Sequence, residues 1–223
     1  MSGLSSVSSN ARNLLSSYDT TRETFYTEFD SSMTDLKDSA RKIKNLDFNV
    51  GKNAINKIEK TDKDGNTTTE IKYNDKMTET LDEAEKFVGH YNDAINFFAD
   101  NDSVSSRMKN LAKTFGDTTY RASNYNQIGI SVNGDGTLEV DREKLAESIE
   151  KNPGKVSRIL GKGGLADKAQ SHVTIANSQR GEIFPSAQKM FGNQLKLASF
   201  YTGKSFLRMN SYSGLGNLIS MMI

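Results

Sequence analysis

Residues 81–98 read LDEAEKFVGHYNDAINFF, and this stretch decides the fold class of the chain. Its apolar positions alternate spacings of three and four, the period of a helix that packs one face against another helix. We call these positions the seam: Leu81, Ala84, Val88, Tyr91, Ile95 and Phe98. The seam predicts either one strand of a two-stranded coiled coil or the buried face of a bundle helix, and both need a partner helix.

The N-terminal part of the chain supplies a matching apolar stripe. From Ala11 to Ile43 the apolar residues fall mostly three, four or seven apart, with no glycine or proline between them. We expect a long helix here whose stripe faces the seam. The stripe residues that we expect to pair with the seam are Tyr18, Phe25, Phe29 and Leu36.

Two turn signals predict small β-hairpins. Asp64-Gly65 lies between strand-like runs within residues 49–77, and Asn133–Gly136 lies between alternating apolar positions within residues 127–141. Asn-Gly and Asp-Gly steps readily adopt the positive φ angles that tight hairpin turns require. The predicted fold is therefore mainly α with small β-hairpins, arranged as an elongated antiparallel helical or coiled-coil bundle.

Capping residues indicate where several helices begin. Thr78 or Thr80 is expected to cap the start of the seam helix, and Asp141 the helix after the second hairpin. Pro153 suits the first turn of a further short helix, where its missing N–H group costs nothing.

The predicted division of the chain follows from these signals. Its segments are a flexible N-terminus (1–10), a long helix (11–48), a hairpin insertion (49–77), a helical domain with the second hairpin (78–200) and a flexible apolar tail (201–223). The tail either folds back onto its own helices or packs against neighbouring subunits, since exposed apolar ends promote aggregation. The residues that we assign to this assembly tail are Leu215, Leu218, Ile219, Met221, Met222 and Ile223.

The composition excludes several classes of site. The chain has no cysteine and two histidines, His90 and His172, so thiolate chemistry is excluded and zinc has almost no ligands. Its 29 basic and 28 acidic residues nearly balance, which gives no argument for nucleic acid or an anionic membrane as partner. No apolar run reaches the roughly 18 residues of a membrane span. We expect no cofactor and no metal.

Two loops carry weak ligand-binding patterns. Asp62, Asp64 and Asn66 have calcium-loop spacing, but the glycine stands too early and no helices flank the loop. Gly161–Gly164 precedes a helix, as phosphate loops do, but the sequence lacks the full phosphate-binding pattern. A plain linker explains the second loop better.

Acid–base catalysis is the third weak pattern. Paired carboxylates can do such work only in a pocket that shifts one pKa, and turn and cap chemistry explains the acidic residues around the second hairpin fully. The chain is therefore expected not to be an enzyme. The carboxylates concerned are Asp135, Glu139, Asp141 and Glu143.

Motifs in residues 80–183 are similar to those of the flagellar filament-cap family, also called flagellar hook-associated protein 2. The Phe87-Val88-Gly89-His90-Tyr91-Asn92-Asp93 stretch resembles that family's Phe-Val-x-x-Tyr-Asn-Asp/Glu segment. The motifs that follow in the family's order are Ile128-Gly129-Ile130, Asp135-Gly136-Thr137-Leu138, Asp141, Lys144-Leu145, Asn152–Val156, Gly164–Lys168 and Gly181-Glu182-Ile183.

This resemblance implies a structural protein of the bacterial flagellum. It implies export through the flagellar type III apparatus without a cleaved signal, an extracellular location, and assembly into a homo-oligomeric ring at the filament tip. The implied partners are further copies of the chain, flagellin and other flagellar axial proteins, and the implied role is to help flagellin assembly at the tip. The implied N- and C-terminal helical segments pair and order on assembly.

The chain departs from the family in two places. Caps usually carry large β-rich outer domains where this chain has only residues 45–77, and its C-terminal segment is interrupted by Gly203, Gly214 and Gly216. A minimal cap, a cap-like paralogue and a related axial protein all remain open. The alternative from another class is a cytoplasmic helical binding module, such as an export chaperone or adaptor, whose seam grips a partner helix.

Overall fold

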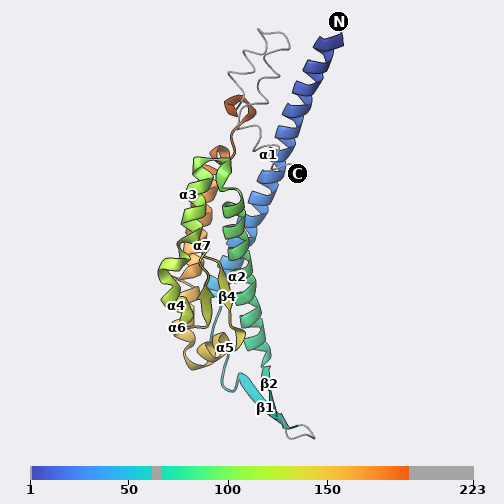
Figure 1. Ribbon diagram of the computed structural model, residues 1–223. Coiled ribbons are helices and arrows are strands. Elements are labelled where there is room, and N and C mark those ends of the chain that lie inside the picture. Colours follow the sequence, from blue (N-terminus) through green and yellow to red (C-terminus); the bar gives the residue numbers. More distant parts are fainter. Residues whose placement is uncertain (1, 62–66, 191–223) are drawn as a thin grey trace. The chain divides into compact units, whose positions relative to one another are not determined.

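The computed structural model describes residues 2–61 and 67–190, which fall into two compact units. The larger unit comprises Asp30–Ile183, and the smaller combines the segments on either side of it. The described residues form helices and two small antiparallel hairpins, which confirms the predicted fold class of mainly α with small β-hairpins (Figure 1). Residues 201–223 of the predicted tail lie outside the described residues, and the predicted division into domains stays a prediction.

The first helix, α1 (Ser2–Asn45), pairs with α2 (Asp75–Asp100) in the larger unit. His90 Nδ1 lies 3.0 Å from the backbone oxygen of Asp35, and Lys42 Nζ lies 3.0 Å from Glu83 Oε1. As α1 advances from Asp35 to Lys42, its partner on α2 retreats from His90 to Glu83. The two helices are therefore antiparallel, as the sequence predicted for a bundle.

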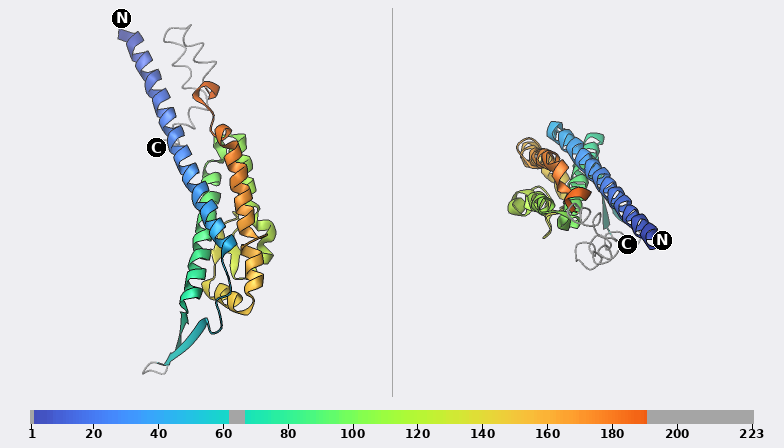
Figure 2. Two further views of the ribbon diagram at one scale, coloured as in Figure 1. Left: turned by 180° about the vertical axis from the view of Figure 1, so that it is seen from behind. Right: turned by 90° about the horizontal axis from the view of Figure 1, so that it is seen from above.

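The helix α7 (Leu165–Ile183) lies along another side of α1 in the larger unit. Arg180 donates two hydrogen bonds, of 2.7 and 2.6 Å, to the carboxylate of Asp30. Lys44 Nζ lies 2.5 Å from Asp167 Oδ1. These pairs again run in opposite directions, so α1 is antiparallel to both α2 and α7. In the two side views of the larger unit these three helices lie side by side (Figures 1 and 2).

Short elements fill the space between α2 and α7. Cap chemistry places several of them: Asp141 Oδ1 accepts from Lys144 N at 3.0 Å, and Asn152 Oδ1 accepts from Lys155 N at 3.0 Å, directly before Pro153. Both predicted starts are confirmed. The elements are η1 (Asp102–Val104), α3 (Ser106–Phe115), η2 (Gly116–Arg121), α4 (Ala122–Asn126), α5 (Arg142–Lys151) and α6 (Pro153–Leu160).

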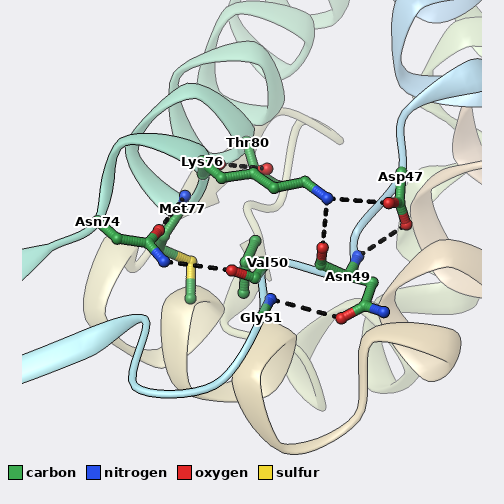
Figure 3. A network of polar contacts seen from close by, with 8 residues as sticks. All are labelled: Asp47, Asn49, Val50, Gly51, Asn74, Lys76, Met77 and Thr80. Atoms are coloured by element: carbon green, nitrogen blue, oxygen red, sulfur yellow. Dashed lines mark hydrogen bonds and ion pairs between the residues drawn. The ribbon is translucent and has the colours of Figure 1, made fainter.

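The predicted cap of α2 was wrong. Asn74 caps this helix by accepting from Met77 N at 2.7 Å, and its amide also donates to Val50 O at 3.2 Å (Figure 3). Thr78 and Thr80 already lie inside the helix, where their hydroxyls donate to backbone oxygens one turn earlier. Asn74 has the extended backbone that a capping residue needs, and the two threonines do not.

Both hairpins are antiparallel and two-stranded. In the first, β1 (Ile55–Thr61) pairs with β2 (Thr67–Tyr73). In the second, β3 (Ile130–Val132) pairs with β4 (Leu138–Val140). The first hairpin leads directly into α2 and the second into α5, so each hairpin is tied to the helix that follows it.

The smaller unit has an aromatic cluster of its own. The ring centroid of Phe184 lies 4.9 Å from that of Phe25 and 5.6 Å from that of Tyr18. Tyr18 Oη donates to Pro185 O at 2.6 Å, and burial raises the pKa of Tyr18 to about 12. In this unit α1 begins at Ser2, before the predicted start at Ala11. The flexibility expected of residues 1–10 stays a prediction.

Candidate functional site

All ten residues of the seam and the stripe are buried, with exposed fractions of 4% or less. The seam lies on α2 in the larger unit, together with Leu36 of α1. Tyr18, Phe25 and Phe29 lie in the smaller unit, where Phe184 packs on the first two rings. The structure thus places only Leu36 of the stripe in the same unit as the seam.

The buried face of α2 is wider than the seam. Phe87 and Ala94 are fully buried beside it, as are Met77 and Thr80 in the first turns of the helix. A two-stranded coiled coil would leave such flanking positions partly exposed. Because α2 also packs against α3, α5 and β4, it is a bundle helix with neighbours on several sides.

Tyr91 ties α2 to α3 in the centre of the larger unit. Its hydroxyl donates to Phe115 O at 3.4 Å, and its ring lies 6.2 Å from Phe87 and 6.4 Å from Phe115. Burial, with a smaller contribution from Asp117, raises the pKa of Tyr91 far above its ordinary value. The phenol therefore stays neutral and acts as a packed donor.

Asn92 holds the second hairpin against α2. Its Nδ2 donates to Leu138 O at 2.8 Å, and its Oδ1 accepts from Leu138 N at 2.8 Å. The bonds from Asn133 N to Thr137 O and from Asp141 N to Gly129 O show that Leu138 turns its own N–H and C=O away from β3. The amide of Asn92 therefore occupies the place of a third strand.

Gly129 lets the hairpin approach α5 closely. Its φ is +85°, and a Cβ atom there would lie 2.7 Å from both Leu145 N and Lys144 Cβ. Such contacts leave room for glycine alone. The Ile128-Gly129-Ile130 and Lys144-Leu145 motifs are thus in direct contact in the folded chain.

Gly136 lets the turn of the same hairpin approach η2. Its φ is +90°, and an added Cβ would lie 3.0 Å from Gly116 Cα. Thr118, fully buried, donates its hydroxyl to Gly136 O at 2.5 Å. Asn92, Gly129 and Gly136 together fix the hairpin on three sides, and we call this arrangement the hairpin clasp.

The glycine-rich loop before α7 is a tight turn. A Cβ on Gly164 would lie 2.1 Å from Ile159 O, so the loop folds back directly onto α6. The N–H of Gly163 donates to Asp167 Oδ2 at 2.5 Å, and the hydrogen bond from Lys44 holds the pKa of that carboxyl below its usual range. A carboxylate thus already occupies a backbone donor that a phosphate would need, which favours the linker interpretation.

A partly buried polar cluster joins α7 to η2, and sequence reasoning missed it. Lys168 Nζ lies 2.7 Å from Asp117 Oδ2, and His172 Nε2 lies 3.9 Å from the same oxygen. His172 is 7% exposed, and its buried Nδ1 has no hydrogen-bond partner among the described residues. Burial lowers the pKa of His172, and Lys168 adds to this effect while Asp117 opposes it.

Two of the carboxylates considered for acid–base catalysis, Asp135 and Asp141, are engaged in hydrogen bonds and an ion pair of the local structure. Asp135 accepts from the backbone N–H and the hydroxyl of Thr137, and these bonds lower its pKa. Asp141 caps α5 and pairs with Lys144 at 2.6 Å, which lowers its pKa as well. Glu139 and Glu143 are exposed. A carboxyl with a raised pKa would be needed for a general acid.

No group of three or more histidine and acidic side chains is placed to hold a metal ion within residues 2–61 and 67–190. Across those same residues, no helix combines the length and the apolarity that crossing a membrane demands. The residues of the calcium-like loop, Asp62, Asp64 and Asn66, lie outside the described residues.

An open hollow of about 350 Å³ lies beside the second hairpin. The hydroxyl of Ser131 at its wall donates to Glu139 O at 3.5 Å, and Asp141 is engaged with Lys144. None of the residues lining the hollow has a buried polar side-chain atom without a hydrogen-bond partner, so we assign no ligand to it. Its walls are Asn126, Gly129, Ile130, Ser131, Glu139, Val140, Asp141 and Lys144.

The fold and the clasp together define a class: a helical structural domain in which motif residues lock a hairpin onto a bundle. Residues 100–200 match the family described as flagellar hook-associated protein 2 C-terminus. This match confirms the resemblance drawn from the motifs, and the Phe87–Asp93 motif lies before the matched range. Comparisons with curated proteins and with solved structures gave no significant match. The matched region supports a structural role in the flagellum in general terms.

Proposed function

We propose that this chain is a self-assembling structural protein of the flagellar axis that acts as a filament cap and helps flagellin to assemble at the tip. The observation that carries the proposal is the family match over residues 100–200, which contains most of the hairpin clasp. The clasp residues form packing contacts and backbone hydrogen bonds, which supports a role as a rigid building block.

The mechanism that we propose is assembly by helix packing. The larger unit supplies a folded block whose seam is already buried, so the surfaces for assembly lie elsewhere. Burial of each large apolar side chain contributes roughly 1.5–3 kcal/mol. The apolar tail from Leu215 to Ile223 is rich in such side chains, and we propose that it packs against neighbouring subunits.

The proposal includes export and location. The chain passes through the flagellar type III apparatus, reaches the extracellular filament and contacts flagellin and other copies of itself there. A chain located at the tip would retain arriving flagellin until it is inserted. Its loss should therefore shorten the filaments and release flagellin into the medium.

Deletion of the gene tests this directly in cells that make the protein. We expect short or missing filaments and more flagellin monomer in the medium, both reversed by the full chain. A chain ending at Gly214 should fold but complement poorly. Unchanged filaments and unchanged flagellin retention would contradict the proposal. A protein found only in the cytoplasm, bound to an export substrate, would favour the adaptor alternative.

A further inference from the structure

The first hairpin is a two-stranded ribbon without a covering layer. None of its described side chains is buried. Most are exposed, and the half-buried ones are Ile55, Ile58, Glu70, Ile71 and Tyr73. Two-stranded hairpins are marginal in water unless a helix or a further strand supports them. This ribbon lies beyond α5 and the start of α2 in the larger unit (Figure 1).

The base of the ribbon is firmly attached. Asn74 joins β2 to α2 and to Val50, and Lys76 adds bonds to Asp47 and to the backbone oxygen of Asn49 at 2.9 and 2.5 Å (Figure 3). On the other side, the ring of Tyr73 lies beneath the guanidinium of Arg142. The ribbon is thus held in one orientation while its outer part is exposed.

Its two edges differ. The start of β1 is covered by α5, because Glu150 accepts from Ile55 N at 3.4 Å and Glu147 pairs with Lys57 at 3.1 Å. On β2, alternate residues hydrogen-bond to β1, and the bond from Asn74 N to Ala54 O shows which residues these are. Thr69 and Ile71 belong to the other set, whose N–H and C=O groups point away from β1. Within the described part of the chain no hydrogen bond reaches those groups. Open edges of this kind pair with further strands.

We propose that the β2 edge binds the β2 edge of a second copy of this chain in antiparallel order, with the two-fold axis at Ile71. The matching edge on the second copy is β2 itself, because α5 covers the start of β1 while β2 is open along its described length, and this pairing gives a closed, two-fold interface. The proposal takes its partner, a second copy, from the self-assembly proposed above.

Charge selects the register. In an antiparallel pair, residues whose backbone N–H and C=O groups point to the partner strand must lie opposite residues of the same kind. Near the middle of β2 this condition allows a two-fold axis at Glu70, Ile71 or Lys72. An axis at Glu70 sets that carboxylate against its own copy, and an axis at Lys72 sets two ammonium groups together. An axis at Ile71 places Glu70 opposite Lys72 of the second copy, twice. Opposite charges across strands are favourable and like charges are not.

Cysteine cross-linking reads this register without interference, because the chain contains no cysteine. In the full chain, Ile71→Cys lies opposite itself across the axis and should form a covalent dimer under mild oxidation. Thr69→Cys is the matched control: in the same register it lies four positions from its own copy, about 13 Å along the strand, and should not cross-link.

Charge variants in the Ile71→Cys background test the selection. Adding Glu70→Lys should slow cross-linking about tenfold, because it turns two attractive pairs into two repulsive ones. Adding Lys72→Glu to that variant should restore cross-linking. Lys60 loses its partner Glu70 in both variants, but the pair of Glu70 with Lys72 of the same strand is broken in the first variant and re-formed with reversed charges in the second. Urea titration of both variants is therefore the control: restored cross-linking at equal stability reports the contact between copies.

Several results overturn the proposal. They are cross-linking of Thr69→Cys that equals or exceeds that of Ile71→Cys, no cross-link from Ile71→Cys, or a cross-link that ignores charge reversal. The ribbon's charges would then serve only to keep the edge from pairing. Cross-linking by Ile71→Cys in a protein that is absent from filaments would contradict the proposed function alone. A protein that is present in filaments but gives no cross-link from Ile71→Cys would contradict this interface alone.

Discussion

The side-chain amide of Asn92 on α2 and the backbone of Leu138 on β4 exchange two hydrogen bonds, each 2.8 Å long. An amide side chain has the same donor and acceptor as a peptide group, so it can complete a strand edge. This contact gives the Tyr-Asn pair of the α2 motif its physical meaning: Tyr91 fills the core while Asn92 holds the hairpin. The motif thus encodes the attachment of one element to another.

Replacing Asn92 with alanine should leave the N–H and C=O groups of Leu138 without partners. We expect the free energy of unfolding to fall by about 2 kcal/mol, the usual cost of unpaired buried groups. Asn92→Asp should cost at least as much, because its carboxylate faces Leu138 O. Urea titration followed by circular dichroism measures this, since the chain has no tryptophan. Asn124→Ala, an exposed position on α4, is the control and should change little.

Gly129→Ala tests the close approach of the hairpin to α5. We expect a loss of at least about 2 kcal/mol, because alanine meets both an unfavourable positive φ and atoms only 2.7 Å away. Gly89→Ala is the matched control. It lies in the interior of α2 with nothing within 4 Å of an added Cβ, so it should stabilise the protein by about 0.5–1 kcal/mol. Equal effects of the two changes would contradict the packing described for Gly129.

The periodic parts of the fold could be predicted from sequence because spacing decides which face of a helix is buried. Leu81, Val88 and Ile95 repeat with the helical period, and all are buried. Phe87 and Ala94 could not be recognised as core in the same way. Their burial depends on how the helices are arranged around α2, which spacing along one helix does not encode.

Ile95→Asp tests the seam itself. A carboxylate at this 4%-exposed position has no partner, and the cost should exceed about 4 kcal/mol and unfold the larger unit. Asn96→Asp introduces the same charge at the adjacent exposed position and should change stability by less than about 0.5 kcal/mol. Circular dichroism at 222 nm distinguishes the two. Retained helix content in Ile95→Asp would argue against a buried seam.

His172 should make stability depend on acid. Burial lowers its pKa in the folded state below the ordinary 6.5, so the unfolded chain takes up the proton first. The free energy of unfolding is therefore highest above pH 6.5 and falls as the pH drops from 6.5 through the folded-state pKa. Carboxyls such as Asp30, whose pKa is lowered chiefly by its hydrogen bond from Arg180, stabilise the fold above pH 3.8, and that stability is lost as the pH falls below 3.8.

His172→Gln should remove the slope that begins at pH 6.5 and continues down through the folded-state pKa of His172, while the steeper loss in stronger acid remains. Urea titrations at half-unit pH intervals give the slope for both proteins. An unchanged slope in the variant would show that another group titrates in this window.

The polar contacts of the site were beyond sequence reasoning because their partners are distant in the chain. Asn92 and Leu138 are 46 positions apart, and Lys168 and Asp117 are 51. The motifs marked Asn92, Gly129 and Gly136 as noteworthy but could not say what each residue touches. Nothing in the sequence marked Asp117 or His172 as neighbours. The cap of α2 could have been found, since Asn74 stands directly before Asp75, a common first-turn residue.

Immunogold labelling of intact filaments tests the central claim most directly, with the label on a tag placed in the native chain. The account predicts gold at the outer ends of filaments, and the protein in the sheared appendage fraction together with flagellin. Label confined to the cytoplasm, with none in sheared filaments of cells that assemble normally, would contradict it.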